Sequence, residues 1–137
     1  SWGCGVLGDK RSKKYLLSGI YILRSVVTVL FLFAPKTDMV VYLFASAMGL
    51  LWLGTVPLTS GLVAQIFGMR YMATLFGVVF FSHQLGSFLG AWLGGRLFDI
   101  TGSYDLMWWI SIALGVAAAA LHLPIADRPL QRAAQAA

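Results

Sequence analysis

The chain has 137 residues, of which 59% are hydrophobic and only 11% are charged, and its net charge is +5. Soluble globular domains contain about 45–50% apolar and about 25% charged residues, so this composition excludes an ordinary soluble domain. The single cysteine, Cys4, excludes an internal disulfide and gives no metal cluster. We therefore expect neither a metal nor a cofactor.

Four long apolar stretches follow one another along the chain. They cover residues 15–34, 39–67, 71–97 and 106–125. A helix needs about 20 predominantly apolar residues to cross the hydrocarbon core of a bilayer, and each stretch is long enough. The loops between them are short, which makes neighbouring helices antiparallel. The sequence predicts an all-α membrane protein with four antiparallel transmembrane helices.

The first span carries a cation at its centre. An arginine there costs roughly 2.5–3.5 kcal/mol on insertion scales, so Arg24 is expected to face protein, water or a ligand. The hydroxyl residues Ser18, Tyr21, Ser25 and Thr28 fall on the same side of that helix. All five acidic residues lie in loops or at helix ends, so Arg24 has no carboxylate partner in this chain. Its alternatives are a structural role, with carbonyls, water or other helices, and the binding of an anionic substrate.

Polar residues in the next two spans are further candidates for a substrate or proton pathway. Trp52, Thr55 and Thr59 recur at helical spacing in the second span, and His83 and Gln84 lie at the middle of the third. An imidazole takes up or releases a proton near neutral pH, which proton-coupled transport requires. Interhelical packing and hydrogen bonding remain the alternative role for these residues.

Small residues and a proline mark two spans for close packing. Gly86, Gly90 and Gly94 repeat every four residues, which lines one helix face with small residues and lets another backbone approach. Pro57 lies within the second span and is expected to kink it. The glycine repeat and Pro57 could alternatively act as hinges for rocking motions of the helices.

The distribution of basic residues predicts the orientation in the membrane. Seven of them fall on one side of the bilayer: Lys10, Arg11, Lys13, Lys14, Arg70, Arg128 and Arg132. Only Lys36 and Arg96 fall on the other side. Because cytoplasmic loops carry the excess of Lys and Arg, the first side and the C-terminus are predicted to be cytoplasmic. The positive charge is thus a topology signal, and we expect no nucleic-acid partner.

The segment from Gly5 to Lys14 resembles the loop signature of the major facilitator superfamily, G-x-x-x-D-(R/K)-x-G-(R/K)-(R/K). The match departs from the signature at Ser12, where the family usually has glycine. Four spans follow, so the resemblance implies the loop between helices eight and nine, followed by helices nine to twelve of a twelve-helix transporter. This chain would then be part of the C-terminal half, cut off upstream, and its partners would include the missing helices and the lipid bilayer.

A second resemblance concerns the subfamily. The stretch from Gly86 to Asp105 is similar to helix eleven of monocarboxylate-transporter-like members, where a G-x-L-x-D-x-x-G-x-Y pattern closes the helix. This resemblance implies a secondary transporter in a bacterial inner membrane that moves a small organic anion, such as a monocarboxylate, together with a proton. In the family, a loop like the one containing Gly5, Asp9, Lys10, Lys13 and Lys14 holds the two halves together in one conformation.

Other functions remain as alternatives. The chain also fits a small four-helix membrane protein that acts as an oligomer, or a drug- or sugar-type member of the same superfamily. A membrane enzyme would need clustered acids, histidines or cysteines, and five dispersed Asp without any Glu do not supply such a cluster. The chain contains no G-x-x-x-x-G-K-(S/T) motif, so it holds no site for ATP of that type.

Overall fold

The computed structural model describes residues 12–128 and contains four helices there. They are α2 (Lys13–Phe33), α3 (Asp38–Phe67), α4 (Met69–Thr101) and α5 (Asp105–His122). All four are long and apolar enough to cross a membrane. Within the described part of the chain there is no β-strand. The prediction of an all-α fold with four membrane-spanning helices is confirmed.

Two helices end at other residues than predicted, because glycine and proline determine where each helix stops. α4 continues to Thr101, so Asp99 lies inside the helix and the turn that follows is shorter than expected. That turn is closed by Gly102, whose left-handed φ of 68° favours glycine. α5 ends at His122 instead of Ile125, because Pro124 lacks the N–H that would continue the helical hydrogen bonds.

The connection between α2 and α3 is held by side chains that cap both helices. Lys36 Nζ donates to the carbonyls of Leu32 and Ala34, both at 3.2 Å, and so satisfies the carbonyl groups at the end of α2. Thr37 Oγ1 accepts from the backbone N–H of Val40 at 3.4 Å and caps the start of α3. The two helices are thereby set antiparallel by a very short loop.

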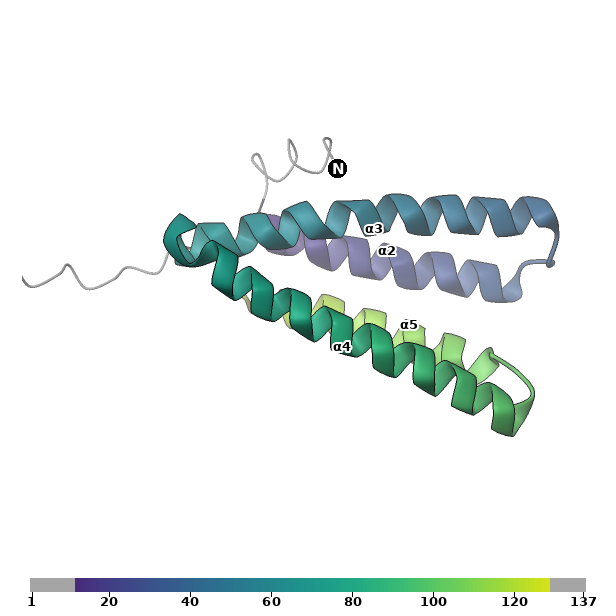
Figure 1. Ribbon diagram of the computed structural model, residues 1–137. Coiled ribbons are helices and arrows are strands. Elements are labelled where there is room, and N and C mark those ends of the chain that lie inside the picture. The colour runs from purple at the N-terminus through teal and green to yellow at the C-terminus, as the bar shows by residue number, and fades with distance from the viewer. Residues whose placement is uncertain (1–11, 129–137) are drawn as a thin grey trace, which may run out of the picture.

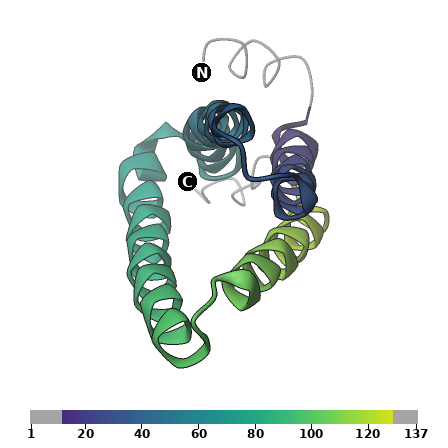
Figure 2. The ribbon, with the colours of Figure 1, turned by 90° about the vertical axis from the view of Figure 1, so that its right-hand side faces the viewer.

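The four helices are arranged in a ring in chain order, so that α5 returns to lie beside α2 (Figures 1 and 2). α2 lies between α3 and α5 and packs on both, whereas α4 packs on α3 and only slightly on α5. Gly68 alone separates α3 from α4, with φ 80°. From this residue α4 diverges from the α2/α3 pair, as Figure 1 shows. Gly94 is the one buried residue of α4.

The tightest helix contact is the crossing of α2 and α5. Ser18 Oγ donates to the carbonyl of Ala119 at 3.0 Å, and Ser25 Oγ donates to the carbonyl of Ile112 at 3.4 Å. Between these two bonds lies Gly115, where a Cβ would collide with Ser25 Oγ. Small residues and serine-to-carbonyl hydrogen bonds therefore bring the two backbones together.

The predicted glycine face on α4 is arranged differently. Gly86 and Gly90 have no heavy atom of another helix near the position of a Cβ, and Gly94 only meets Met107 Cγ at 3.8 Å. Among residues 12–128, no other backbone packs closely on this face. Pro57 lies inside α3, which continues on both sides of it. A hinge role for these residues stays a prediction.

Different contacts fix the two ends of the bundle. At the end with the basic residues, Leu17, Leu58 and Leu62 form a small buried core between α2 and α3. At the opposite end, Phe31 stacks on Phe44 at 4.1 Å between ring centroids, and Trp108 meets both rings edge-on. α2, α3 and α5 thus pack on one another at both ends of the bundle, whereas most of α4 does not take part in these contacts.

Polar contacts close the basic end, and we call them the basic-end clasp: Ser12, Lys13, Lys14, Gln65, Ile125 and Asp127. Lys13 Nζ donates to Gln65 Oε1 at 2.9 Å, and Lys14 Nζ donates to the Ile125 carbonyl at 3.0 Å. Ser12 donates to the carboxylate of Asp127, and Gln65 donates to the carbonyl of the same residue. The Ser12 hydrogen bond and the charges of Lys14 and Arg128 lower the pKa of Asp127, although desolvation opposes them.

The α2/α5 crossing predicts a strong effect of added volume at Gly115. Gly115→Leu must push Ser25 and α2 away, which costs about 1–3 kcal/mol for an overpacked site. Gly19→Leu is the matched control, because nothing lies near that position on α2. We expect thermal unfolding of the detergent-purified protein to shift down for Gly115→Leu and hardly at all for Gly19→Leu. Equal melting temperatures would contradict the crossing.

The basic-end clasp predicts a pH-dependent contribution from Asp127. Because its pKa is lowered in the folded state, the carboxylate stabilises the fold above its ordinary pKa, and that contribution is lost as the pH falls through the lowered value. Asp127→Ala should therefore melt below the wild type at pH 7, and the two curves should converge in acid, once the pH lies below the lowered pKa. A gap of the same size at both pH values would show that the charge of Asp127 does not matter.

Candidate functional site

The middle of the bundle contains a cation held by aromatic rings. The guanidinium carbon of Arg24 lies 5.8 Å from the ring centroid of Tyr21, one turn earlier on α2, and 5.6 Å from that of Trp52 on α3. A guanidinium over an aromatic face within about 6 Å is attracted by the ring quadrupole. Within residues 12–128, no carboxylate pairs with Arg24 and no acceptor hydrogen-bonds to its guanidinium. Arg24 is thus positioned by the two rings.

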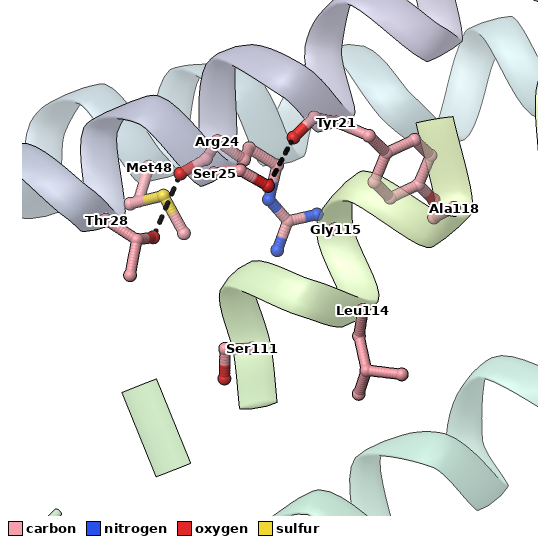
Figure 3. Close-up of a pocket in the computed structure, with 9 residues that line it drawn as sticks. All are labelled: Tyr21, Arg24, Ser25, Thr28, Met48, Ser111, Leu114, Gly115 and Ala118. Carbon is pink, nitrogen blue, oxygen red and sulfur yellow. Dashed lines mark hydrogen bonds between the residues drawn. The ribbon is translucent and has the colours of Figure 1, made fainter. Parts of the chain in front are cut away.

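The guanidinium of Arg24 faces a cavity of about 300 Å³ between α2, α3 and α5. Figure 3 shows the side chain extending from α2 toward α5, past Ser25 and Gly115. The lining residues are Tyr21, Arg24, Ser25, Thr28, Met48, Ser111, Leu114, Gly115 and Ala118. Small-molecule sites usually measure about 300–1,000 Å³ and combine apolar walls with a few polar groups, and this cavity lies at the lower limit.

Most hydroxyl groups of the cavity wall already donate to the backbone. Ser25 donates to the Tyr21 carbonyl at 3.1 Å, Thr28 to the Arg24 carbonyl at 2.9 Å and Ser111 to the Met107 carbonyl at 2.9 Å. With respect to the described residues 12–128, these bonds leave the guanidinium of Arg24 and the phenol of Tyr21 as the lining groups that donate no hydrogen bond. The cavity therefore presents one fixed positive charge between apolar walls, which suits a small amphiphilic anion.

His83 joins this group from the third helix. Its imidazole meets the indole of Trp52 edge-on, with 5.4 Å between ring centroids and 66° between planes, and Phe80 lies 6.2 Å away on the same helix. Three residues that the sequence placed separately on three spans, Arg24, Trp52 and His83, are therefore neighbours. The indole of Trp52 lies between the other two.

Other predicted site residues are not part of this group. Thr55 and Thr59 donate to carbonyls of their own helix, those of Leu51 at 3.2 Å and Thr55 at 2.8 Å. Gln84 is exposed and makes no hydrogen bond within residues 12–128. Of the loop signature, Lys13 and Lys14 belong to the basic-end clasp. The remaining members, Gly5, Asp9 and Lys10, lie outside the described residues.

One neighbour of the site was missed by sequence reasoning. His122 at the end of α5 packs on Tyr21 with 5.1 Å between ring centroids, and its Nδ1 lies 2.7 Å from the Ala118 carbonyl. The contact depends on the α2/α5 crossing, which the sequence does indicate. Small residues recur every four positions at Ser111, Gly115 and Ala119. The resulting sequence of contacts, His122–Tyr21–Arg24–Trp52–His83, is called the cation–aromatic row below.

Comparisons with known proteins find that this chain is similar to a segment of several longer membrane proteins, one of them named as a transporter. It is 27% identical over 133 residues to the uncharacterized MFS-type transporter YcxA of Bacillus subtilis, covering 93% of this chain and 32% of YcxA. It is also 27% identical over 128 residues to protein spinster homolog 1 of cattle and of human, covering 91% of this chain and 24% of each relative. No family model and no solved structure matches the chain.

The chain thus spans about a quarter to a third of the length of these relatives. The relatives match it across all four helices, which agrees with an integral membrane protein. These matches do not test whether the chain belongs with the monocarboxylate-type members, which the sequence of the third span resembles. The comparisons relate the chain to a segment of a major facilitator (MFS) type transporter.

Proposed function

We propose that this chain is part of a secondary transporter that takes up or exchanges a small organic anion, such as a monocarboxylate, together with a proton. The observation that carries the proposal is Arg24. It is a membrane-embedded cation held on Tyr21 and Trp52, with no carboxylate partner in residues 12–128, at the wall of a cavity of about 300 Å³. An intramembrane charge is costly, and such residues usually mark a substrate or ion pathway.

The walls of the cavity support an amphiphilic anion as the substrate. Met48, Leu114 and Ala118 are apolar, and the guanidinium of Arg24 binds a carboxylate through two parallel N–H donors. A small ligand that places its carboxylate on Arg24 and its carbon skeleton against these side chains fits both parts of the cavity. His83, on the other side of Trp52, is the candidate for the coupled proton.

The direction of the helices in the membrane is also a proposal. Lys13 and Lys14 begin α2, Arg70 lies where α3 meets α4, and Arg128 follows α5. Figure 1 shows that these helix ends lie together at one end of the bundle. Lys36, in the loop between α2 and α3, and Arg96, near the end of α4, belong to the opposite helix ends. The excess of basic residues supports a cytoplasmic location of the first end, in a bacterial inner membrane. The substrate would then pass between these two ends.

Uptake measurements test the role of Arg24. The complete protein, reconstituted in proteoliposomes with an imposed pH gradient, should accumulate at least one of radiolabelled lactate, pyruvate and benzoate. Arg24→Gln removes the charge-assisted hydrogen bonds and should lower uptake about 10–100-fold, corresponding to about 1.5–3 kcal/mol.

Two further variants make this result specific. Arg24→Lys keeps the charge and should retain part of the uptake, although an ammonium lacks the planar fork of donors. Arg96→Gln is the matched control, because Arg96 is exposed near the end of α4. Accumulation of none of the three anions, or undiminished uptake by Arg24→Gln, would remove the anion assignment.

Cysteine labelling tests the orientation. In a cysteine-free background that includes Cys4→Ser, Thr37→Cys places a single thiol in the loop before α3, and Arg70→Cys places one in the first turn of α4, at the opposite end of the helices. A membrane-impermeant maleimide added to intact cells should label Thr37→Cys, and it should label Arg70→Cys only after the cells are opened. The reverse pattern would place the basic end outside.

A further inference from the structure

We propose that Trp52 is a positioning residue that couples the protonation of His83 on α4 to anion binding at Arg24 on α2. The inference rests on the proposed function, because it assumes an anion at Arg24. It adds a route between the two events, through the indole that contacts both groups. Trp52 is the only described residue that lies against both the guanidinium and the imidazole.

The geometry of Trp52 allows it to act on both partners at once. The centroid distances are 5.6 Å from the indole to the guanidinium carbon of Arg24 and 5.4 Å to the imidazole of His83. Neither group has a hydrogen-bonded or ion-paired partner in residues 12–128 that would fix it independently. The side chain of Ser87 does not reach the imidazole, since its hydroxyl donates to the His83 carbonyl at 3.0 Å. The indole is thus the common support of both groups.

Protonation of His83 changes the strength of the cation–π attraction between the indole of Trp52 and the guanidinium of Arg24. When the imidazole takes up one proton, it becomes a second cation that interacts with the same aromatic ring. The cation–π attraction between the indole and the guanidinium therefore weakens. The added positive charge also raises the electrostatic potential at the cavity wall. Both effects favour an anion on Arg24. Reciprocally, a bound anion favours the protonated imidazole by the same factor.

Other ionisable groups near His83 are few. α2 contributes Arg24 and, beyond it, Tyr21, whereas α3 contributes only the uncharged indole. On α4 the ring neighbour is Phe80, which does not titrate. α5 reaches the cation–aromatic row through His122, which packs on Tyr21 at the far end. Within residues 12–128, His83 is therefore the ionisable imidazole next to Trp52, and His122 reaches the row only through Tyr21.

The test measures benzoate affinity and proton uptake in the complete protein in nanodiscs. Wild-type affinity should rise about tenfold between pH 8 and pH 5.5, within the usual range of coupling between two sites. Calorimetry in buffers with different ionisation enthalpies should show net proton uptake on benzoate binding near pH 7. His83→Gln should bind with the high-pH affinity at every pH and take up no proton, whereas His122→Gln should keep the wild-type proton uptake.

Variants of Trp52 decide whether the indole is the link. Trp52→Leu should still bind benzoate, about 3–10-fold more weakly, with less proton uptake and a shallower pH profile than the wild type, because only the electrostatic effect of His83 remains. Trp52→Phe keeps a smaller ring and should give an intermediate pH dependence, which also decides the question if Trp52→Leu does not fold. Trp92→Leu is the matched control, because Trp92 is exposed on α4 and contacts none of the row. It should behave as the wild type.

The outcomes separate the two proposals. Benzoate binding that depends on Arg24 but keeps the wild-type pH dependence in Trp52→Leu, or in Trp52→Phe if that variant carries the test, would overturn the coupling and leave the anion site intact. Binding that survives Arg24→Gln, or no binding to the wild type at all, would overturn the proposed function and the coupling with it. Wild-type proton uptake in His83→Gln would overturn the coupling, because the proton would then be taken up elsewhere.

Discussion

The crossing of α2 and α5 is the contact on which the rest of the arrangement depends. A lipid environment offers no hydrophobic drive for helix association, so packing and interhelical hydrogen bonds must hold the helices together. Ser18 and Ser25 supply those bonds to α5, and Gly115 permits the close approach. With α2 fixed in this way, Arg24 is aimed at the cavity and Tyr21 at His122. The polar side of α2 therefore both packs on α5 and forms a wall of the candidate site.

The helices and the chemistry of single positions were predictable from the sequence, whereas their mutual contacts were not. Length and apolar character predict four spans because the bilayer imposes them, and Arg24 and His83 attract notice because polar groups inside a membrane are costly. That Trp52 lies between them depends on the rotation of three helices about their axes. Helical spacing defines the faces of one helix but does not say which face meets which neighbour.

The glycine repeats illustrate the same limit. Small residues every four positions occur both on α4, at Gly86, Gly90 and Gly94, and on α5, at Ser111, Gly115 and Ala119. Only the second set brings backbones together in the part of the chain that the structure describes. A repeat predicts that close approach is permitted, and the partner surface decides where it occurs. The serines of α2 complete the pair, because their hydroxyls reach the carbonyl groups that the small residues of α5 leave accessible.

Gly68 is the single residue that connects the long helices α3 and α4, so it can act as a pivot between them. Trp52 and His83 lie almost equally far along the chain from this single connecting residue, on either side of it. At 1.5 Å per residue, each is about 23 Å from the pivot. A change of about 5° in the angle between the two helices therefore moves the imidazole by about 2 Å relative to the indole, since displacement grows with distance from a pivot. Small rotations at one glycine are enough to bring these two rings into contact or to part them.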